Sequence, residues 1–328
     1  MRVFVTGGTG FIGRHLLPRL AAAGHECRCL ARPQSRTDAV GAGGVEWVRG
    51  DIGDPESLAR AAAGCDAAVH LANLYSFWER DRTALRRANV EGTGNVLRAC
   101  LEAGVSKAVH VSSVVVFGRQ ERRPFAEDAP KGVGLCSEYA RTKYEGDRIA
   151  WRLRDREGLP LVVLYPAGVL GPGDPQASGR YIEDLLRGRL PARLLEDAVT
   201  TWVYVGDVAE AIARALEKPD AVGEEYLVGD CRSSMGEFNR LVGEVGGVAL
   251  PRLSMPWPLA FLGGEALTAW ARLSGRPPLW GMARESLRTV RQGVEADGSK
   301  AARELGLEYT PLRRMLELTI GREKGTGQ

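Results

Sequence analysis

Short apolar runs alternate with longer amphipathic segments over the first half of the chain. Most of the runs are rich in branched aliphatic residues, and they lie at residues 3–6, 26–31, 45–49, 67–70, 108–112 and 161–164. Runs of this kind are typical of strands covered on both faces of a parallel sheet. The segments between them predict helices at residues 12–23, 55–63, 83–103 and 138–157. The alternation predicts an α/β fold with a doubly wound parallel sheet.

The alternation ends near residue 167, where the breaker cluster Gly171-Pro172-Gly173-Asp174-Pro175 follows the last predicted strand. After it come short helices, a few short strands and a segment rich in Pro and Trp. We therefore predict a sheet domain over residues 1–166 and a smaller lid domain over residues 167–328. Some segments of the second part are expected to return to the sheet.

Three glycines spaced three residues apart directly follow the first predicted strand. Gly7 permits a tight turn, Gly10 leaves room for phosphates to approach the backbone, and Gly13 lets the next helix pack close to the strand. The start of that helix would direct free N–H groups at the anion. The motif therefore predicts that residues 1–166 bind a dinucleotide.

A second motif lies on the helix predicted at residues 138–157. Tyr139 and Lys143 are four residues apart and so share one face of this helix. A free tyrosine has a pKa of about 10, and a nearby ammonium lowers that pKa and favours the phenolate. Upstream, the strand at 108–112 ends in Ser112-Ser113, at the sheet edge where active groups gather, and a serine hydroxyl there can hold a carbonyl oxygen. Together these residues predict catalysis.

Composition limits the classes of partner. The 328 residues include 44 Lys and Arg against 41 Asp and Glu, which argues against the concentrated basic face of a nucleic-acid-binding protein. A strand that begins at residue 2 leaves no room for a signal peptide, and no uninterrupted apolar stretch has the length that spans a bilayer. The six cysteines lack the spacing of a disulfide framework or zinc site. We expect a cytoplasmic protein with a small-molecule substrate, without a metal ion, a membrane span or a nucleic-acid partner.

The order of these motifs resembles that of the extended short-chain dehydrogenase/reductase family over nearly the whole chain. The shared pieces are residues 6–13, 50–52, 70–72, 89–93, Ser112-Ser113, Tyr139 with Lys143, 166–174 and 297–301. The Leu-Ala-Arg-Pro-x-Ser turn at residues 30–35 and an aromatic C-terminal segment resemble one branch of this family. That branch contains dihydroflavonol 4-reductases, 3β-hydroxysteroid dehydrogenases and hopanoid-associated sugar epimerase-like proteins.

The resemblance implies roles for individual residues. It selects Ser113 over Ser112 as the catalytic serine beside Tyr139 and Lys143, and it makes Asn89 a structural asparagine. It implies that the cofactor contacts Gly7, Thr9, Gly10, Phe11, Ile12, Gly13, Asp51, Ile52, Leu71, Ala72, Lys143, Pro166 and Val169. Homodimers formed through the helices at residues 83–103 and 138–157 are common in the family.

The end of the second predicted strand favours NADP(H) over NAD(H). An NAD site usually has an acidic residue at this position to bind the ribose hydroxyls. This chain has none there, and Arg32, Ser35 and Arg36 would suit a 2′-phosphate. The alternative is that these residues form an ordinary solvated basic loop.

Two positions separate the reactions that this family performs. Dehydratases carry an Asp-Glu pair directly after the catalytic serine or threonine, whereas this chain has Val114-Val115, which argues against dehydration. Nucleotide-sugar epimerases usually carry a diphosphate-binding arginine where this chain has Thr200. A sugar diphosphate would need other cations, and those nearby in sequence are Arg180, Arg187, Arg189 and Arg193.

Apolar and aromatic residues favour a lipophilic substrate. The valines at 114–116 would form a wall beside Ser113, Tyr75 lies in an aromatic loop after the fourth strand, and Trp202 lies near Thr200. Further tryptophans lie at residues 257, 270 and 280, and most of these are expected to pack in the core. We therefore assign Tyr75, Val114, Val115 and Trp202 to the substrate pocket.

The sequence supports three hypotheses. The first is an NADP(H)-dependent carbonyl reductase or alcohol dehydrogenase in which Tyr139 transfers the proton, Ser113 orients the oxygen, and Lys143 tunes Tyr139 and holds the ribose. The second is a nucleotide-sugar epimerase that oxidises and re-reduces one carbon and retains NAD(H). The third is a non-catalytic dinucleotide sensor, which the intact Ser, Tyr and Lys set argues against.

Overall fold

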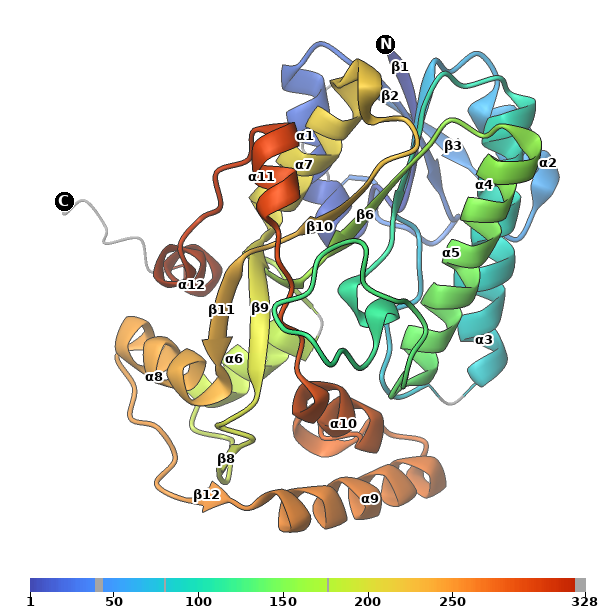
Figure 1. Ribbon diagram of the computed structural model, residues 1–328. Helices are drawn as coiled ribbons and strands as arrows, with labels where there is room; N and C mark the ends of the chain where they lie inside the picture. The colour runs from blue at the N-terminus through green and yellow to red at the C-terminus, as the bar shows by residue number, and fades with distance from the viewer. Residues whose placement is uncertain (39–43, 80, 176, 322–328) are drawn as a thin grey trace.

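The computed structural model describes residues 1–38, 44–79, 81–175 and 177–321. Its centre is a parallel sheet of seven strands (Figure 1). In spatial order these are β10 (Glu225–Val228), β6 (Leu161–Pro166), β5 (Ala108–Val111), β4 (Ala67–His70), β1 (Arg2–Thr6), β2 (Glu26–Ala31) and β3 (Val45–Arg49). The doubly wound parallel sheet predicted from the sequence is confirmed. The expected return of a segment from the second half of the chain is confirmed by β10, which pairs with β6 but was not located from the sequence.

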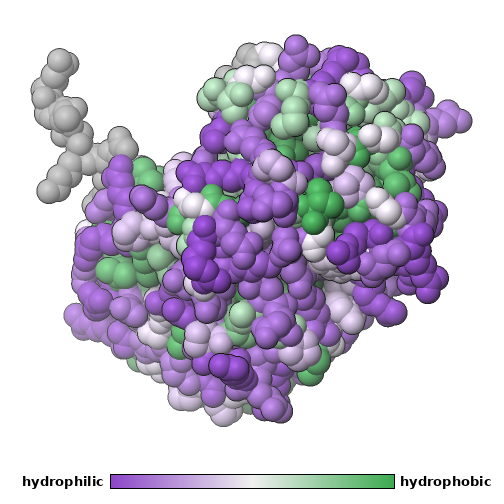
Figure 2. Space-filling model, turned by 45° about the horizontal axis from the view of Figure 1, so that its top comes forward, coloured by the Kyte–Doolittle hydropathy of each residue, from purple (hydrophilic) through white to green (hydrophobic). Residues whose placement is uncertain are grey.

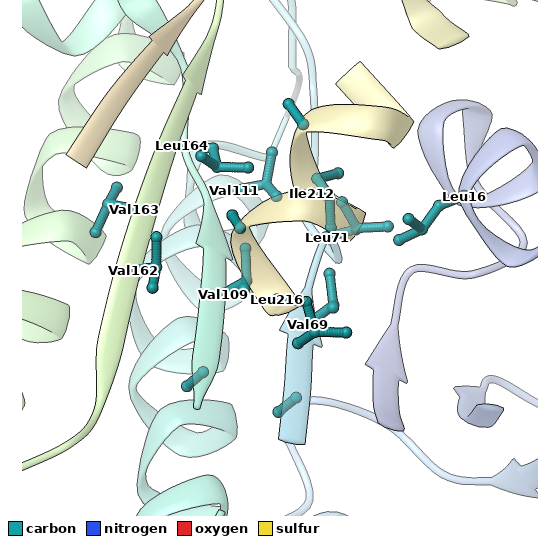
Figure 3. Close-up of a cluster of buried hydrophobic side chains, with 14 of the residues drawn as sticks. Leu16, Val69, Leu71, Val109, Val111, Val162, Val163, Leu164, Ile212 and Leu216 are labelled. Atoms are coloured by element: carbon teal, nitrogen blue, oxygen red, sulfur yellow. The ribbon is translucent and has the colours of Figure 1, made fainter. Parts of the chain in front are cut away.

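Helices cover both faces of this sheet (Figure 1). One face carries α1 (Phe11–Ala22), α7 (Val205–Glu217) and α11 (Ser299–Leu305), and the other carries α2 (Pro55–Ala62), α4 (Thr93–Glu102) and α5 (Glu138–Glu157). Figure 3 shows the apolar layer between the sheet and α1 and α7, with Val69, Val109 and Val162 on the strands and Leu16 and Ile212 on the helices. Burial of this layer fixes the strand ends that carry the site.

The helix predicted at residues 83–103 is confirmed as one helical run from Arg82 to Glu102, with wider turns in its middle. It consists of α3 (Arg82–Arg86), a wider π-helical segment η1 (Arg87–Gly92) and α4. Asn89 lies in the π-helical segment, where its side chain accepts a hydrogen bond from Leu74 N at 2.8 Å and donates to Leu74 O at 3.0 Å. These bonds hold the loop after β4 against the helix, as the structural role implied for Asn89 requires.

The remaining elements form a smaller layer below the sheet (Figure 1). Its strands are β7 (Gly168–Leu170), β9 (Val199–Tyr204) and β11 (Cys231–Ser234) in one sheet, and β8 (Arg193–Leu194) paired with β12 (Ser254–Met255). Its helices are α6 (Ala177–Leu186), α8 (Met235–Gly246), α9 (Trp257–Ser274), α10 (Arg284–Gln292) and α12 (Leu312–Ile320). Short 3₁₀ turns are η2 (Val114–Phe117), η3 (Pro219–Ala221) and η4 (Leu279–Gly281).

No helix in the described part of the chain has the length and apolar character needed to cross a membrane. Among the same residues, no three His, Cys, Asp or Glu side chains come together in a way that could hold a metal ion.

Candidate active site

The loops that follow β1, β2, β4, β5 and β6 leave the sheet at the same edge, because these strands are parallel. They line one continuous cavity of about 1120 Å³. The cavity begins at the glycine loop after β1 and extends to η4 and α10 in the smaller layer. Both ends of a dinucleotide and a substrate could therefore share it.

The glycine loop has the shape that its spacing predicts. Gly7 has a φ of +76°, and a Cβ there would lie 2.7 Å from the backbone nitrogen of Ala72. A Cβ on Gly13 would lie 2.6 Å from the Cα of Gly8, so α1 could not approach the loop so closely with any other residue. At Gly10 a Cβ would meet only Gly7 O, at 3.1 Å, and its other side is open. The loop therefore fits a pyrophosphate at the start of α1.

Most of the sequence-predicted site residues line this cavity together. They are Gly7, Thr9, Gly10, Phe11, Ile12, Gly13, Arg32, Ser35, Asp51, Ile52, Leu71, Ala72, Tyr75, Ser113, Val114, Val115, Tyr139, Pro166, Val169 and Trp202. Arg36 and Lys143 are not among the lining residues. The Arg36 side chain is 78% exposed and its guanidinium lies 3.5 Å from the Asp38 carboxylate.

Tyr139 and Ser113 meet at the carboxyl end of β5. Ser113 begins η2, with its Oγ 3.5 Å from the Val115 nitrogen, and Tyr139 lies in the first turn of α5, which Ser137 caps by accepting from Ala140 N at 3.1 Å. Burial raises the pKa of Tyr139, and its hydrogen bond with Ser113 opposes that rise. The serine hydroxyl is thus held next to the phenol that would transfer the proton.

Lys143 lies one helical turn after Tyr139 and is buried. Its Nζ donates a hydrogen bond to the carbonyl of Val111 at 3.0 Å, at the end of β5. Burial lowers the pKa of Lys143, and the carboxylate of Asp147 opposes that change. The Lys143 ammonium is therefore held at the end of β5 and lies in the field of the buried Asp147 carboxylate.

Sequence reasoning missed this buried acid and its partners. Asp147 Oδ2 accepts a hydrogen bond from Ser112 Oγ at 2.7 Å, and Asp147 Oδ1 lies 3.0 Å from His110 Nε2. The His110 ring stacks on that of His70 with a centroid distance of 5.3 Å. Asp147 follows Lys143 by four residues, so the spacing that linked Tyr139 to Lys143 could also have found it. Burial lowers the pKa of both histidines, which favours their neutral forms.

Aromatic rings surround the Tyr139 end of the cavity. The Tyr75 and Phe77 rings contact that of Tyr139 edge-on, at centroid distances of 4.9 and 5.9 Å. On the far side, the Trp202 ring stacks on Phe238 at 4.5 Å. The predicted wall of three valines is reduced to Val114 and Val115, because η2 turns the Val116 side chain into the core. Among the three lid tryptophans, Trp280 lines the cavity, Trp257 packs on the second core and Trp270 is exposed.

Few charged residues line the cavity. Among the described lining residues they are Arg32, Asp51, Arg87 and Asp174. None of the four arginines that could replace the missing diphosphate-binding residue is among them. Three of those arginines pair instead with acidic neighbours: Arg187 with Glu183 at 2.8 Å, Arg189 with Asp184 at 3.4 Å and Arg193 with Glu196 at 3.2 Å.

The glycine loop, the serine at the end of β5 and the tyrosine and lysine of α5 define a Rossmann-fold enzyme of the extended short-chain dehydrogenase/reductase type. The chain belongs to the NAD dependent epimerase/dehydratase family, whose family model matches residues 3–229. It is therefore an enzyme of the class that uses a nicotinamide dinucleotide.

Individual relatives carry different names. A Synechocystis sp. protein whose name contains dihydroflavonol 4-reductase is 31% identical over 95% of this chain and 92% of its own length. Sterol demethylase protein B of Methylococcus capsulatus is 31% identical over 99% of each chain. Among solved structures, a Thermus thermophilus UDP-glucose 4-epimerase in complex with NAD has a TM-score of 0.76, with 26% identity over 100% of each chain.

Proposed function

We propose that this enzyme is an NADP(H)-dependent carbonyl reductase or alcohol dehydrogenase that acts on an apolar substrate. The observation that carries the proposal is the lining of the cavity around Tyr139. Tyr75 and Phe77 contact the Tyr139 ring, and Val114 and Trp202 line the same cavity. Among the described lining residues there is no lysine, and the arginines are Arg32 and Arg87. An apolar ketone or alcohol fits this lining, whereas a sugar diphosphate would lack cations.

The chain supplies the proton chemistry and the orientation. When bound, a nicotinamide dinucleotide supplies or accepts the hydride. Ser113 would hold the substrate oxygen by a hydrogen bond, and Tyr139 would give that oxygen its proton in reduction or take it in oxidation. Lys143 would hold the nicotinamide ribose and favour the phenolate of Tyr139 electrostatically. The apolar walls would keep water from the reacting carbon.

The preference for NADP(H) rests on Arg32 and Ser35, which line the cavity after β2. An arginine can bind a 2′-phosphate through two parallel hydrogen bonds. Arg36 would contribute less, because its guanidinium lies outside the cavity beside Asp38.

The first experiment identifies any nucleotide that freshly purified protein releases on denaturation, and then measures NADPH and NADH binding to the emptied protein. We expect an empty protein that prefers NADPH. Arg32→Ala should weaken NADPH binding by about tenfold to a hundredfold, the loss of a charge-assisted contact, with little change for NADH. Arg36→Ala is the matched control and should change NADPH binding less. Equal effects on both cofactors would contradict the preference.

The second experiment tests the reaction. Tyr139→Phe keeps the ring and its aromatic contacts but removes the transferable proton, so turnover of an apolar ketone should fall about 10²- to 10⁴-fold with cofactor binding nearly unchanged. Turnover close to that of the parent enzyme would overturn the assignment of Tyr139.

A sugar epimerase is the second candidate, and the 26% identity to an NAD-bound UDP-glucose 4-epimerase over the full chain favours it. Such an enzyme would retain NAD or NADH through purification and convert a nucleotide sugar without added cofactor. Either result would replace the reductase proposal. Homodimerisation through α4 and α5 and a cytoplasmic location stay predictions.

A further inference from the structure

Helix α9 fully buries only small residues, and several of its large apolar residues are exposed, whereas Trp257, Phe261 and Leu267 are partly buried. Its buried residues are Ala260, Gly264, Thr268 and Ala271. A Cβ on Gly264 would collide with Leu287 of α10, and Thr268 Oγ1 accepts a hydrogen bond from Arg284 N at 2.9 Å. An ordinary surface helix has the reverse arrangement, with its large apolar residues on the protein side. The arrangement of α9 therefore leaves an apolar face without a partner in the described chain.

The exposed residues of this face are large and close in sequence. Leu259, Leu262, Trp270 and Leu273 are exposed by 58%, 63%, 39% and 90%. Ten large hydrophobic side chains are exposed among the described residues, and seven lie within residues 253–280, which add Leu253, Leu279 and Trp280. We use the name α9 face for Leu259, Leu262, Trp270 and Leu273 of the helix together with Leu253, Leu279 and Trp280, which flank the helix in sequence. Single exposed hydrophobic residues are normal, but a contiguous group marks an interaction surface.

Figure 2 shows another side of the molecule for comparison. That side of the molecule is mainly hydrophilic, with small separate hydrophobic areas. In Figure 1, α9 lies along the lower edge of the molecule, beyond α10. Its outward side therefore points away from the rest of the described chain.

The sequence segment that carries the α9 face has an excess of positive charge. Residues 247–284 contain Arg252, Arg272, Arg276 and Arg284 but only one acidic residue, Glu265, although the whole chain is nearly balanced. Glu265 is paired with Arg284 at 3.5 Å. Arg252, Arg272 and Arg276 are exposed beside the leucines. Exposed leucines and tryptophans bordered by arginines are complementary to the surface of an anionic lipid bilayer.

The α9 face continues into the wall of the cavity. Trp280 is 37% exposed and also lines the cavity, together with Met282 just after η4 and Leu287 and Val290 of α10. An apolar molecule that left a bilayer at this face would therefore meet cavity walls that are apolar, as the bilayer interior is.

We propose that the α9 face lies on anionic lipid membranes, parallel to the surface, and that an apolar substrate enters the cavity from the bilayer past Trp280. The entry of substrate rests on the proposed function, whereas the lipid contact does not. The partner is the lipid surface itself, bound through leucines and tryptophans at the level of the headgroups and through arginines to anionic lipids.

The experiment is flotation of the full-length protein with two kinds of vesicle. One contains phosphatidylcholine alone, and the other also contains about 30% phosphatidylglycerol, which gives its surface a negative charge. We expect the protein to float with the anionic vesicles and less with the neutral ones. Leu262→Glu/Leu273→Glu should reduce the bound fraction at least about tenfold, because it places two charges on the apolar face. Val133→Glu/Val222→Glu adds the same charge at two exposed hydrophobic sites elsewhere and should float like the parent.

Reduction of a small water-soluble ketone, measured in parallel, separates the two proposals. Equal rates for both double variants would show intact enzymes, so a loss of flotation would belong to the α9 face. If no ketone is reduced but flotation depends on Leu262 and Leu273, the reductase proposal fails and the lipid contact stands. The lipid contact is overturned if the parent protein stays with the soluble fraction. It is also overturned if the two double variants float equally, or if light scattering shows that Leu262→Glu/Leu273→Glu only separates copies of this chain.

Discussion

At the scale of single residues, the site contains a buried acid, Asp147, that the set of Ser113, Tyr139 and Lys143 would not by itself predict. Lys143 and Asp147 occupy successive turns of α5, and both are almost inaccessible to solvent. Burial favours the neutral amine, and the carboxylate of Asp147 favours the ammonium. Asp147 is therefore a positioning residue, which acts on the reaction through the charge of Lys143.

The change Asp147→Asn should shift the pH profile of carbonyl reduction. Without the carboxylate the pKa of Lys143 falls further, so the ammonium is lost at a lower pH. Reduction needs protonated Lys143 and protonated Tyr139, and the alkaline limb of kcat should therefore move to lower pH. The measurement is kcat against pH at saturating cofactor.

Ser112→Ala is the matched control, because it removes one hydrogen bond to Asp147 Oδ2 but keeps the charge. Its alkaline limb should stay near that of the parent enzyme. An equal shift in both variants would mean that packing, and not the charge of Asp147, controls the profile.

At the scale of elements, α10 joins the wall of the cavity to the catalytic helix. The backbone nitrogen of Glu138, the residue before Tyr139, donates a hydrogen bond to Glu285 Oε2 at 2.9 Å. A carboxylate at a helix N-terminus is also favoured by the helix dipole. The same α10 supplies Leu287 and Val290 to the cavity. Glu285 therefore fixes the distance between the substrate wall and Tyr139.

Glu285→Ala should lower kcat/KM for an apolar ketone about fivefold to thirtyfold, with cofactor binding unchanged. The reason is the loss of one charge-assisted hydrogen bond, about 1–2 kcal/mol, between α10 and α5. The control is Glu56→Ala, which removes a first-turn carboxylate from α2, a helix that contributes no described residue to the cavity lining. A fall in cofactor affinity, or the same fall in kcat/KM for Glu56→Ala, would contradict this role.

The elements of the first half could be predicted because their signals are local. Each central strand except β10 lies at one of the short runs in the first half of the chain, and the glycine loop requires its glycines on steric grounds. The return of a segment to the sheet was expected, but β10 was not located because Glu225–Val228 lies beyond residue 167, where the regular alternation ends. The π-helical stretch within the helix at residues 83–103 contains Asn89, whose contact with a loop fifteen residues upstream is not visible in the periodicity.

The site could be predicted only in part for the same reason. Tyr139 and Lys143 are neighbours along one helix, and Ser113 follows a strand. The far wall of the cavity combines segments separated by most of the second half of the chain, from Trp202 to Val290. Arg36 lies in the same loop as Arg32, and only the folded backbone shows that the two differ in their access to the cavity.

At the scale of the whole molecule, an ion-pair cluster joins the start of the chain to its second half. Glu210 of α7 accepts hydrogen bonds from Arg19 of α1 and from Arg214, and Arg214 also donates to the Leu305 carbonyl. The hydrogen bond from Arg19, followed by that from Arg214, lowers the pKa of Glu210 from about 4.5 to about 2. The native state thus binds the Glu210 proton more weakly than the unfolded state.

This stabilisation should be complete above the unfolded pKa and lost as the pH falls from about 4.5 through about 2. Glu210→Gln should therefore lower the Tm at pH 7, and its difference from the parent should narrow over that range. The measurement is Tm against pH by circular dichroism, with the exposed Glu102→Gln as control. A difference that does not vary with pH would assign the effect to packing.

The single cavity that holds both the glycine loop and the aromatic walls has a kinetic consequence. Gly10 and Tyr139 line the same cavity in the described structure, so the nicotinamide itself would complete the compartment in which the substrate lies. Addition of the two ligands should then be compulsory in order, with the dinucleotide first. The substrate would bind the free enzyme too weakly to detect, and the oxidised or reduced dinucleotide would be the last product to leave.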